Sequence, residues 1–543
     1  MNIKSNWKRY AYASAIIVLA GFSSCKESEY TNPDVDTSSV TPGVGERDEL
    51  TKDSIFLYAK QVYLWNTALP TYDVFKPRSF TAGTDLNAYN AELFAITRFG
   101  TNPATNQPYE YSGVEGEPKY SYIADANDSN PLAMIAPKGS VNTDGVGYDL
   151  GFLTFTPYGS DTNYRLYVNA VFPGSAAAKI GLTRGAEITT INGKRIGSNF
   201  QAEVDLINTL LDNETASAVL KGTKADGTAF EETLNRSSYT SSPVYKDKIF
   251  EQNGKKVGYI ALARFSQLTS PSGTNPSDTN LDPVFSRFAA AGLTDLIVDL
   301  RYNGGGYVNT AEYLINLIAP STATGVMYSE VYNTTMQTKK ATILKNQPLT
   351  DENGEIRYGS DGKMLTYANV SYTVADNTAN FAKKGGLTGI KNVVFIVSGN
   401  TASASELTIN ALKPIVNVKL VGEKTYGKPV GFFPVTIENR YDVYFSMFET
   451  KNSKNEGGYY AGFTPDIVNA TDDARRDFDD PSENYVARSL ELLAPGTPTN
   501  ARASMTVQGK GGVTLSISPT MSKKLTPKPI FVGMVETRHK VEQ

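Results

Sequence analysis

The chain has 543 residues, of which 40% are hydrophobic and 20% charged, so its composition is that of an ordinary soluble protein but its length exceeds what one hydrophobic core supports. Its net charge of −4 excludes the basic field that nucleic-acid-binding surfaces require, and one histidine with one cysteine can hardly supply a zinc site or a disulfide. We expect about two to four domains, no cofactor or metal and no nucleic-acid partner.

The N-terminal residues have the pattern of an export signal. Two lysines and an arginine lie among the first nine residues, and the apolar run 11–22 that follows is too short to span a bilayer comfortably. The sequence "GFSSC", which ends at Cys25, resembles a bacterial lipobox, in which the cysteine is lipidated and becomes the mature N-terminus. We predict a lipoprotein signal peptide over 1–24; the alternative is an ordinary signal peptide with an incidental cysteine.

Residues 25–46 are polar and predict a tether. Glu27 and Glu29, just after the cysteine, favour display on an outer membrane surface. We therefore expect the protein in the cell envelope, lipid-anchored on the periplasmic or the outer-membrane surface.

Residues 47–140 predict a small helical N-terminal domain. The helical pattern extends to about Phe99, and "SIFLYAKQVYLWN" is crowded with core-type side chains, so we expect Trp65 and the neighbouring tyrosines to serve packing. Residues 100–140 are rich in Asn, Pro, Gly and Tyr, which predicts connecting loops and short strands.

Residues 145–240 predict a compact module built mainly of strands. "YDLGFLTFT" and "YRLYVNAVF" alternate as strands do, "PGSAAAKIGL" and "FQAEVDLINTLL" predict helices, and Asn192-Gly193 predicts a tight turn between strands. In this order the elements resemble a PDZ domain, and "PGSAAAKIGLTRGAEITTINGK" is the stretch that carries the resemblance.

The PDZ resemblance implies that the strand-opening loop receives the carboxylate of a peptide tail through backbone N–H groups while the peptide adds a strand to the sheet. The matching substrate-binding residues are Asp149, Leu150, Gly151 and Phe152. Asp149 stands where the family often has glycine, and its charge opposes a terminal carboxylate. The alternative is a PDZ-shaped domain that acts only as a spacer or lid.

Residues 246–495 alternate strands and helices, which predicts an α/β domain with a largely parallel sheet and ligands near the carboxyl ends of its strands. A polar insertion rich in Tyr and Thr, residues 320–385, interrupts the alternation. For the polar extension 496–543 we expect either a small added β segment or a floppy tail, and the sequence assigns it no role.

Three small-residue turns follow apolar strands of this domain: Asn303–Gly306, the turn around Ser403, and Tyr426–Lys428. An α/β sheet brings such turns together along one edge. Serine needs a base, lysine can serve as one where burial lowers its pKa, and backbone N–H groups stabilise an oxyanion. The turns therefore contain the parts of a Ser–Lys acyl-transfer site.

On the local residues alone, a purely structural interpretation of Ser403 stays open. The motif S-A-S-E that begins at Ser403 fits a helix capping box, and the G-x-S-x-G signature of a nucleophile elbow is missing from "GNTASASELT". The only histidine is His539 in the polar tail, which disfavours a Ser-His-Asp triad. A lipidated Cys25 excludes a cysteine peptidase.

From about residue 47 to about residue 495 the chain resembles the carboxyl-terminal processing (tail-specific) serine peptidases. "DLRYNGGG", "TASASE", "GEKTYGKP" and "GFTPDIVN" match the family's glycine turn, nucleophile segment, lysine segment and closing strand. Ser403 and Lys428 are 25 residues apart, as nucleophile and base are in the family. The resemblance implies a multidomain α+β fold: a small helical N-terminal domain, a PDZ-like module and a crotonase-like or ClpP-like α/β peptidase core.

The resemblance also implies roles for individual residues. Ser403 matches the nucleophile and Lys428 the general base, and the oxyanion donors would be the N–H of Ala404 and one from Gly305 or Gly306.

One position departs from the family. Many members have a glutamine four residues after the lysine that orients the amine, whereas this chain has Phe432 there, and Pro429 follows the lysine directly. Apolar surroundings favour a lowered lysine pKa but remove an orienting hydrogen bond.

We therefore expect an exported, lipid-anchored serine endopeptidase that cleaves protein or peptide substrates near their C-termini, with PDZ-assisted substrate binding. The alternative is a catalytically weak or inactive peptide-binding lipoprotein on the same fold, which Phe432 favours. A third interpretation, a hydrolase of small esters or lipids, has no feature of its own beyond the same dyad. The sequence leaves the oligomeric state open.

Overall fold

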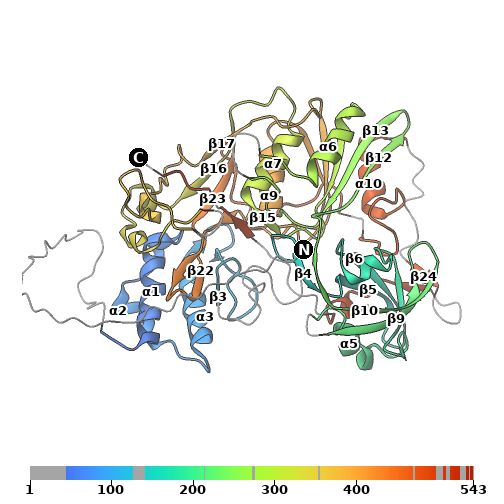
Figure 1. Ribbon diagram of the computed structural model, residues 1–543, viewed down its shortest axis with the longest axis horizontal. Coiled ribbons are helices and arrows are strands. Elements are labelled where there is room, and N and C mark those ends of the chain that lie inside the picture. The colour runs from blue at the N-terminus through green and yellow to red at the C-terminus, as the bar shows by residue number, and fades with distance from the viewer. Residues whose placement is uncertain are drawn as a thin grey trace, which may run out of the picture. The chain divides into compact units, whose positions relative to one another are not determined.

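The computed structural model describes residues 44–125, 141–212, 215–271, 276–351, 355–468, 471–496, 506–508, 514–525, 533–536 and 538–541. The predicted signal peptide, Cys25 and nearly all of the predicted tether lie outside these residues. Within the described ranges, no helix is both long and apolar enough to cross a membrane. The described residues combine helices and several sheets in a multidomain α+β fold, as the sequence predicts (Figure 1).

In the N-terminal region, helices α1 (Arg47–Val62) and α3 (Asp85–Ile96) pack together. Trp65 packs as expected: its ring stacks on Tyr109, with centroids 4.3 Å apart. The remaining elements are α2 (Tyr72–Phe75), the 3₁₀ turns η1 (Asn66–Ala68) and η2 (Pro77–Ser79), and the strands β1 (Thr101–Asn102), β2 (Gln107–Pro108) and β3 (Tyr122–Asp125). Strand β3 pairs antiparallel with β22 (Tyr441–Tyr444), so the N-terminal region shares a sheet with a distant part of the chain.

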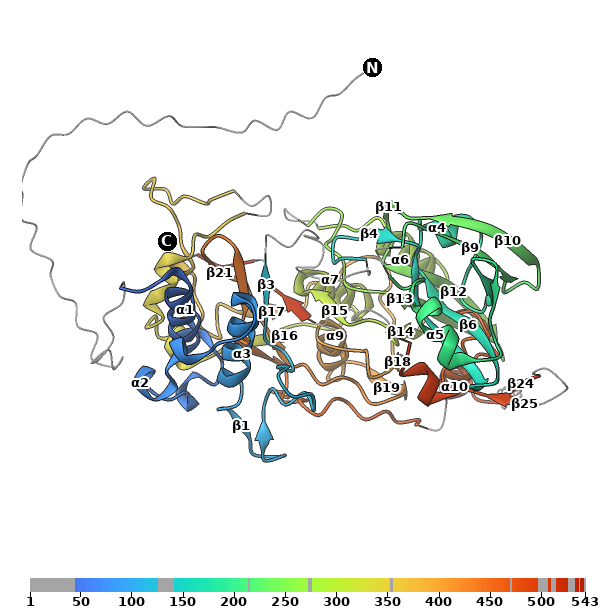
Figure 2. The same cartoon turned by 90° about the horizontal axis from the view of Figure 1, so that it is seen from below.

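The next region is a six-stranded sheet of order β10-β9-β7-β6-β5, with β8 paired to β7. Figure 2 labels its strands β6, β9 and β10. Both turn residues between β7 and β8, Asn192 and Gly193, have positive φ (49° and 76°), as a tight hairpin requires. Strand β5 forms one end of the strand order, which leaves an edge at which a further strand can pair. The elements are β4 (Val146–Asp149), β5 (Phe152–Ser160), β6 (Asn163–Val171), α4 (Ala176–Lys179), β7 (Glu187–Ile191), β8 (Lys194–Arg195), α5 (Phe200–Asn208), β9 (Ser217–Thr223), β10 (Ala229–Asn235) and β11 (Ser237–Thr240), which pairs with β4.

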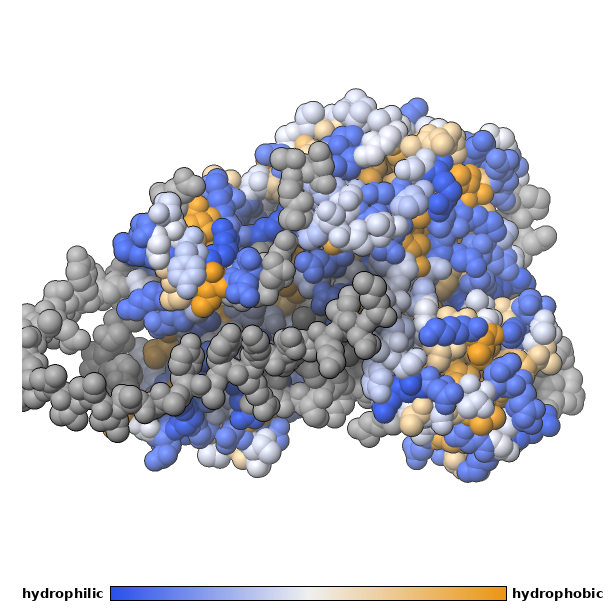
Figure 3. Space-filling view, viewed as in Figure 1, coloured by the Kyte–Doolittle hydropathy of each residue, from blue (hydrophilic) through white to orange (hydrophobic). Residues whose placement is uncertain are grey.

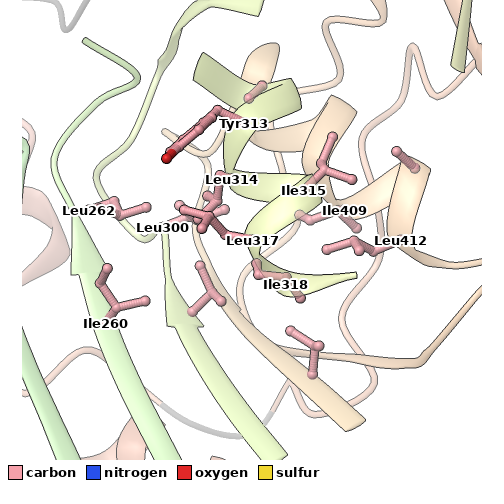
Figure 4. Close-up of a cluster of buried hydrophobic side chains, with 14 of the residues drawn as sticks. Ile260, Leu262, Leu300, Tyr313, Leu314, Ile315, Leu317, Ile318, Ile409 and Leu412 are labelled. Atoms are coloured by element: carbon pink, nitrogen blue, oxygen red, sulfur yellow. The ribbon is translucent and has the colours of Figure 1, made fainter. Parts of the chain in front are cut away.

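The central sheet has the order β12-β13-β14-β18-β19; β12 and β13 are antiparallel, and the other neighbours are parallel. Alternate residues of β13 enter different cores: Ile260 and Leu262 pack with α6, α7 and α9, whereas Tyr259 packs with α10 (Figure 4). The bounds are β12 (Val244–Gln252), β13 (Lys255–Leu262), β14 (Asp295–Asp299), β18 (Asn392–Val397), β19 (Asn417–Gly422), α6 (Leu281–Ala290), α7 (Val308–Ile318), α9 (Ala404–Leu412) and α10 (Asn484–Leu493). Both faces of the sheet are thus covered, which explains its continuous apolar strands.

The segment 320–385 contributes to a second sheet of order β17-β16-β23-β20. Its strands are β16 (Val326–Tyr332), β17 (Thr378–Asn380), β20 (Val430–Gly431) and β23 (Phe448–Asn452), and nearby elements are α8 (Thr334–Gln337), η4 (Thr342–Asn346), η5 (Tyr367–Asn369) and β21 (Val435–Ile437). Many of their buried side chains, such as Tyr332, Leu344 and Phe448, share one core with α1 and α3, whereas Met327 and Tyr328 of β16 pack with the central sheet.

The described parts of the extension 496–543 pack against the rest of the protein. Strand β26 (Gly533–Val535) pairs in parallel with β15 (Gly305–Tyr307), and the other elements are β24 (Thr506–Gln508), β25 (Thr514–Ser516) and α11 (Pro519–Ser522). The dark red arrow beside β15 in Figure 2 is β26. This part of the extension is therefore an added β segment, one of the two expected alternatives.

Exposed large apolar side chains are scattered over the described surface, among them Val74, Tyr111 and Tyr358. On the face drawn in Figure 3, the apolar areas are separated by hydrophilic ones. Single apolar side chains of this kind are normal on a protein surface.

Candidate active site

The three turns predicted from the sequence follow neighbouring parallel strands. Strand β14 precedes the glycine turn, β18 precedes the turn at Ser403, and β19 precedes the turn at Lys428. Because the strands are parallel and paired in register, their carboxyl ends lie at one edge of the sheet. The fold therefore brings the turn that begins at Asn303 together with Lys428, which is 125 residues further along the chain.

Ser403 has an unusual backbone and a buried side chain. Its φ of 60° and ψ of −110° are strained for a residue other than glycine, and it directly precedes helix α9. Its N–H donates to Glu406 Oε2 at 3.0 Å, as in a capping box. Its Oγ, however, has no hydrogen-bond partner among the described residues and is not exposed. The hydroxyl thus has the position of a capping-box serine but makes no hydrogen bond of normal geometry to the helix.

Lys428 is fully buried, and its amine lies among aromatic groups. Nζ donates to the carbonyl oxygen of Tyr120 at 3.3 Å and lies 4.5 Å from the centre of the Phe432 ring. Burial lowers the pKa of Lys428 to about 7, against the opposing effect of the carboxylates of Glu110 and Glu406. The lowered pKa makes the uncharged amine, which is the form that accepts a proton, available near neutral pH.

Glu406 connects the serine turn to the lysine turn. Its buried Oε2 accepts the N–H of Ser403 at 3.0 Å and the N–H of Lys428 at 2.7 Å. Its Oε1 accepts the N–H of Gly427 at 2.8 Å and the hydroxyl of Thr425 at 2.6 Å. These donors favour the ionised carboxylate, although burial raises its pKa. In the sequence, Glu406 is only the last residue of the S-A-S-E motif, where it fits a helix capping box. Its position three residues after Ser403 was the one signal that it could contact the active site.

The glycine turn packs directly against the start of α9. Gly305 has a φ of 112°, and a Cβ there would lie only 3.1 Å from both Ala402 O and Ala404 N, so the position requires glycine. The N–H of Ala404 is the first of the helix and has no acceptor within it. The N–H of Gly305 donates to Asn303 Oδ1 at 2.9 Å. Gly306, with a φ of 140°, forms a parallel bridge with Phe265.

Asn303 is a second residue that the sequence analysis did not single out. Its carbonyl oxygen accepts the N–H of Ala402 at 3.2 Å and the hydroxyl of Ser405 at 3.0 Å. Its side chain holds the N–H of Gly305. Asn303 therefore connects the glycine turn to the serine turn.

The predicted peptide-tail loop lies at the start of β5, in a different sheet from these turns. Asp149, Leu150 and Phe152 are all nearly inaccessible to solvent. Asp149 Oδ1 accepts the Tyr239 hydroxyl at 2.7 Å, and a Cβ on Gly151 would collide with the Ser175 side chain. The carboxylate of Asp149 is thus held inside the module.

Comparison with known proteins shows that part of this chain is similar to a family of peptidases. Residues 256–469 match the model of peptidase family S41. The chain is 26% identical over 256 residues to a carboxyl-terminal-processing protease of Picosynechococcus, covering 47% of this chain and 49% of the relative. It is 23% identical over 309 residues to a probable CtpA-like serine protease of Staphylococcus aureus, covering 56% of this chain and 50% of the relative. The chain thus spans about half the length of these curated relatives.

A solved structure shares the fold. A crystal structure of a Bacteroides fragilis protein assigned to the S41 proteases superposes with a TM-score of 0.53 at 21% identity, covering 82% of this chain and 98% of that one. The matched residues 256–469 include all three turns: the glycine turn, the turn at Ser403 and the turn at Lys428. Residues 256–469 of this chain are therefore similar to the peptidase family S41 domain.

Proposed function

We propose that the protein is a serine endopeptidase that cleaves protein or peptide substrates near their C-termini, with Ser403 as nucleophile and Lys428 as general base. The observation that carries the proposal is the shared carboxylate oxygen of Glu406, which accepts the backbone N–H groups of both residues. The match of residues 256–469 to the S41 family model supports the reaction class. The lowered pKa of Lys428, about 7, supplies an uncharged amine at physiological pH.

In the acylation step, Lys428 Nζ takes the proton of Ser403 Oγ while that oxygen bonds to the carbonyl carbon of the substrate. The N–H of Ala404 and an N–H of the glycine turn stabilise the resulting oxyanion, at about 3–4 kcal/mol per donor. As the intermediate collapses, the peptide C–N bond breaks, and the Lys428 ammonium returns its proton to the leaving amine. The strained backbone of Ser403 suits a nucleophile held in one orientation.

In the deacylation step, Lys428 takes a proton from a water molecule whose oxygen bonds to the acyl carbon. The ester bond to Ser403 then breaks, and the serine oxygen recovers the proton from Lys428. One water is consumed, and a carboxylic acid and an amine are released for each bond cut.

Substrate binding has to complete the serine–lysine hydrogen bond. Ser403 Oγ has no partner among the described residues, whereas Lys428 Nζ donates to Tyr120 O. Catalytic hydrogen bonds often form only in the substrate complex. In this chain the Phe432 ring, rather than a glutamine amide, lies beside the amine, so the amine has an apolar neighbour that does not compete for its protons.

The test is hydrolysis of an unfolded protein substrate. Ser403→Ala and Lys428→Ala are each expected to abolish turnover, while Lys424→Ala, an exposed lysine of the same turn, is expected to retain it. A serine-directed phosphonate should form an adduct that mass spectrometry maps to Ser403. Wild-type rates in both active-site variants would show that the assignment is wrong.

A peptide-binding protein without turnover is the second candidate, and the unbonded Ser403 hydroxyl favours it. It predicts peptide binding with no phosphonate adduct under any condition. Hydrolysis of small esters by the same dyad is distinguished by comparing peptide and ester substrates. Turnover of peptides with loss in Ser403→Ala excludes the binding-only function.

We further propose that Cys25 carries a lipid and holds the protein in the cell envelope, on the periplasmic or outer-membrane surface. The support is the lipobox-like "GFSSC" and the polar segment after it. Metabolic labelling with a radioactive fatty acid should mark the wild-type protein but not Cys25→Ala. Equal labelling of both proteins would contradict this site.

The third part of the proposal concerns substrate docking. In this proposal the C-terminal tail of the substrate pairs with the exposed edge of β5, and the bond to be cleaved is thereby brought to Ser403. Because Asp149 Oδ1 already bonds to Tyr239, backbone pairing along β5 contributes more to this docking than capture of a terminal carboxylate. Amidating the C-terminus of a peptide substrate should therefore change KM little, and a large rise in KM would contradict this docking mode.

A further inference from the structure

The extension 496–543 has no part in the function proposed above, yet its described residues lie at both places where that function needs a peptide. One part lies at the turns of the central sheet, and another lies at the edge of the β5 sheet. The extension therefore contacts both of the surfaces that a peptide substrate would use.

At the central sheet, β26 has backbone contacts on both sides. On one side it pairs in parallel with β15 of the glycine turn. On the other side Phe432 N donates to Met534 O at 3.3 Å, and Glu536 N donates to Phe432 O at 3.4 Å. β26 therefore lies between the glycine turn and the segment that follows Lys428, in the extended form that a peptide substrate adopts when it adds a strand.

The carbonyl oxygen of Gly533 lies beside the glycine turn and near the start of α9. A Cβ placed on Gly305 would lie 2.4 Å from Gly533 O and 3.1 Å from Ala404 N, so both atoms border the same small space. A carbonyl oxygen near the first N–H of α9 is what the proposed mechanism requires of a scissile bond. The extension thus presents its own backbone to the catalytic turns.

At the β5 sheet, the extension uses the open edge of β5. Ile517 forms an antiparallel bridge with Tyr158, and Ser518 N donates to Pro157 O at 3.1 Å. Met521 and Leu525 are nearly inaccessible to solvent and belong to the hydrophobic core of this module.

The extension also reaches the helix beside that edge. The side-chain amide of Asn208, at the end of α5, donates to Lys524 O at 3.3 Å. An antiparallel segment with apolar side chains on a sheet edge, next to a helix, is how a peptide ligand binds by strand addition.

The polar contacts that hold β26 and the residues after it are partly open to water. Arg538 pairs with Glu312 and Lys540 with Asp376, and the two basic side chains are 47% and 64% exposed. Exposed ion pairs are weak and are screened by salt. Among the described residues of this part, Met534 is fully buried, Glu536 is nearly so, and the His539 ring packs against Tyr367 and Phe433. A competing peptide therefore has to replace a short strand and these contacts.

We propose that the C-terminal extension is a built-in competitor of the substrate: residues 514–525 occupy the β5 edge, and residues 533–536 occupy the catalytic turns. The inference rests on the proposed peptidase function for its consequence, which is a resting enzyme that a substrate activates by displacing the extension. It accounts for the unbonded hydroxyl of Ser403, because the catalytic hydrogen bond forms only with substrate.

The first test measures displacement without catalysis. In a full-length Cys25→Ser background, which removes the only native thiol, Met534→Cys places a thiol at a fully buried position of β26. Alkylation of that thiol should be slow, and an excess of a synthetic peptide copying residues 526–543 should accelerate it. Met336→Cys, equally buried in a different core, is the matched control and should not respond. An unchanged alkylation rate at Met534→Cys would overturn the inference.

The second test measures turnover of a chain that ends at Leu525. If the extension occupies the site in at least nine molecules of ten, removing β26 raises kcat/KM about tenfold or more. The copied peptide should restore inhibition, competitively with substrate. Unchanged kcat/KM in a folded truncated chain would overturn the inference, and if truncation prevents folding the alkylation result decides. Absence of turnover in every variant would refute the peptidase function but leave the displacement measured by alkylation intact.

Discussion

Glu406 is the residue whose replacement most directly tests the geometry of the site, because its carboxylate accepts four hydrogen bonds from the serine and lysine turns. In Glu406→Gln, the amide oxygen can keep two of these donors. The amide NH₂ group then faces the other two, which are N–H or O–H donors and cannot bond to it. Each donor left buried and unsatisfied costs about 1–3 kcal/mol, so we expect the variant to lose about 2–6 kcal/mol of stability.

The same substitution should also change the pKa of Lys428, in a direction that the structure predicts. The negative charge of Glu406 raises the pKa of Lys428, in opposition to burial. Removing the charge therefore moves the lysine pKa below about 7, and the acid limb of kcat/KM should move to lower pH. Because two of the four hydrogen bonds that connect the turns are lost, kcat at the pH optimum should fall by about 100-fold, as for a small misplacement of reacting groups.

Thermal unfolding and the pH profile of kcat/KM together form the assay. Glu203→Gln is the matched control, since Glu203 on helix α5 is also buried and accepts the N–H of Gly197 at 2.8 Å and of Asn199 at 3.1 Å. Both variants should unfold at lower temperature, but only Glu406→Gln should shift the acid limb. An acid limb that stays in place or moves to higher pH would refute the electrostatic reasoning.

Three further outcomes follow from the same contacts. For the unmodified protein, kcat/KM should fall about tenfold per pH unit below pH 7 and level off above it, because Lys428 must be uncharged; a limb near pH 10 would contradict a buried base. Asn303→Ala removes the side chain that holds the glycine turn, so kcat should drop about 10–100-fold with little change in KM; steady-state kinetics in which only KM changes would exclude this role. Asp472→Ala leaves the buried guanidinium of Arg184 without a paired carboxylate, so thermal unfolding should show a loss of about 3 kcal/mol, whereas Asp466→Ala at an exposed pair should cost under about 1 kcal/mol.

Local patterns predicted much of the fold. The alternating and continuous apolar runs placed the strands of the central sheet and of the β5 sheet, and Asn192-Gly193 marked a hairpin turn whose two residues have the positive φ values it needs. The small-residue turns at Asn303–Gly306, Ser403 and Lys428 could be expected at one edge because parallel strands end on one side. These features depend on residues close in the chain, and a single sequence contains them.

Local patterns could not decide whether Ser403 caps a helix or stands free. The same four residues fit both interpretations, and the structure has elements of both: the backbone N–H bonds to Glu406 while the hydroxyl stays unbonded. The difference depends on a φ of 60° and on burial, neither of which follows from the residue type.

The amino-acid sequence by itself determined which residue types stand after which strands, and hence that a serine, a lysine and a glycine turn could meet. Only the tertiary structure decided that Glu406 bonds to both turns, that Phe432 lies against the lysine amine, and that β26 pairs with the glycine turn from more than 200 residues away. The physical reason is that a buried carboxylate and an unpaired strand edge both need hydrogen-bond partners, and the packing of the whole chain decides which partners lie within reach. That choice depends on contacts between distant segments, which no short stretch of the chain encodes.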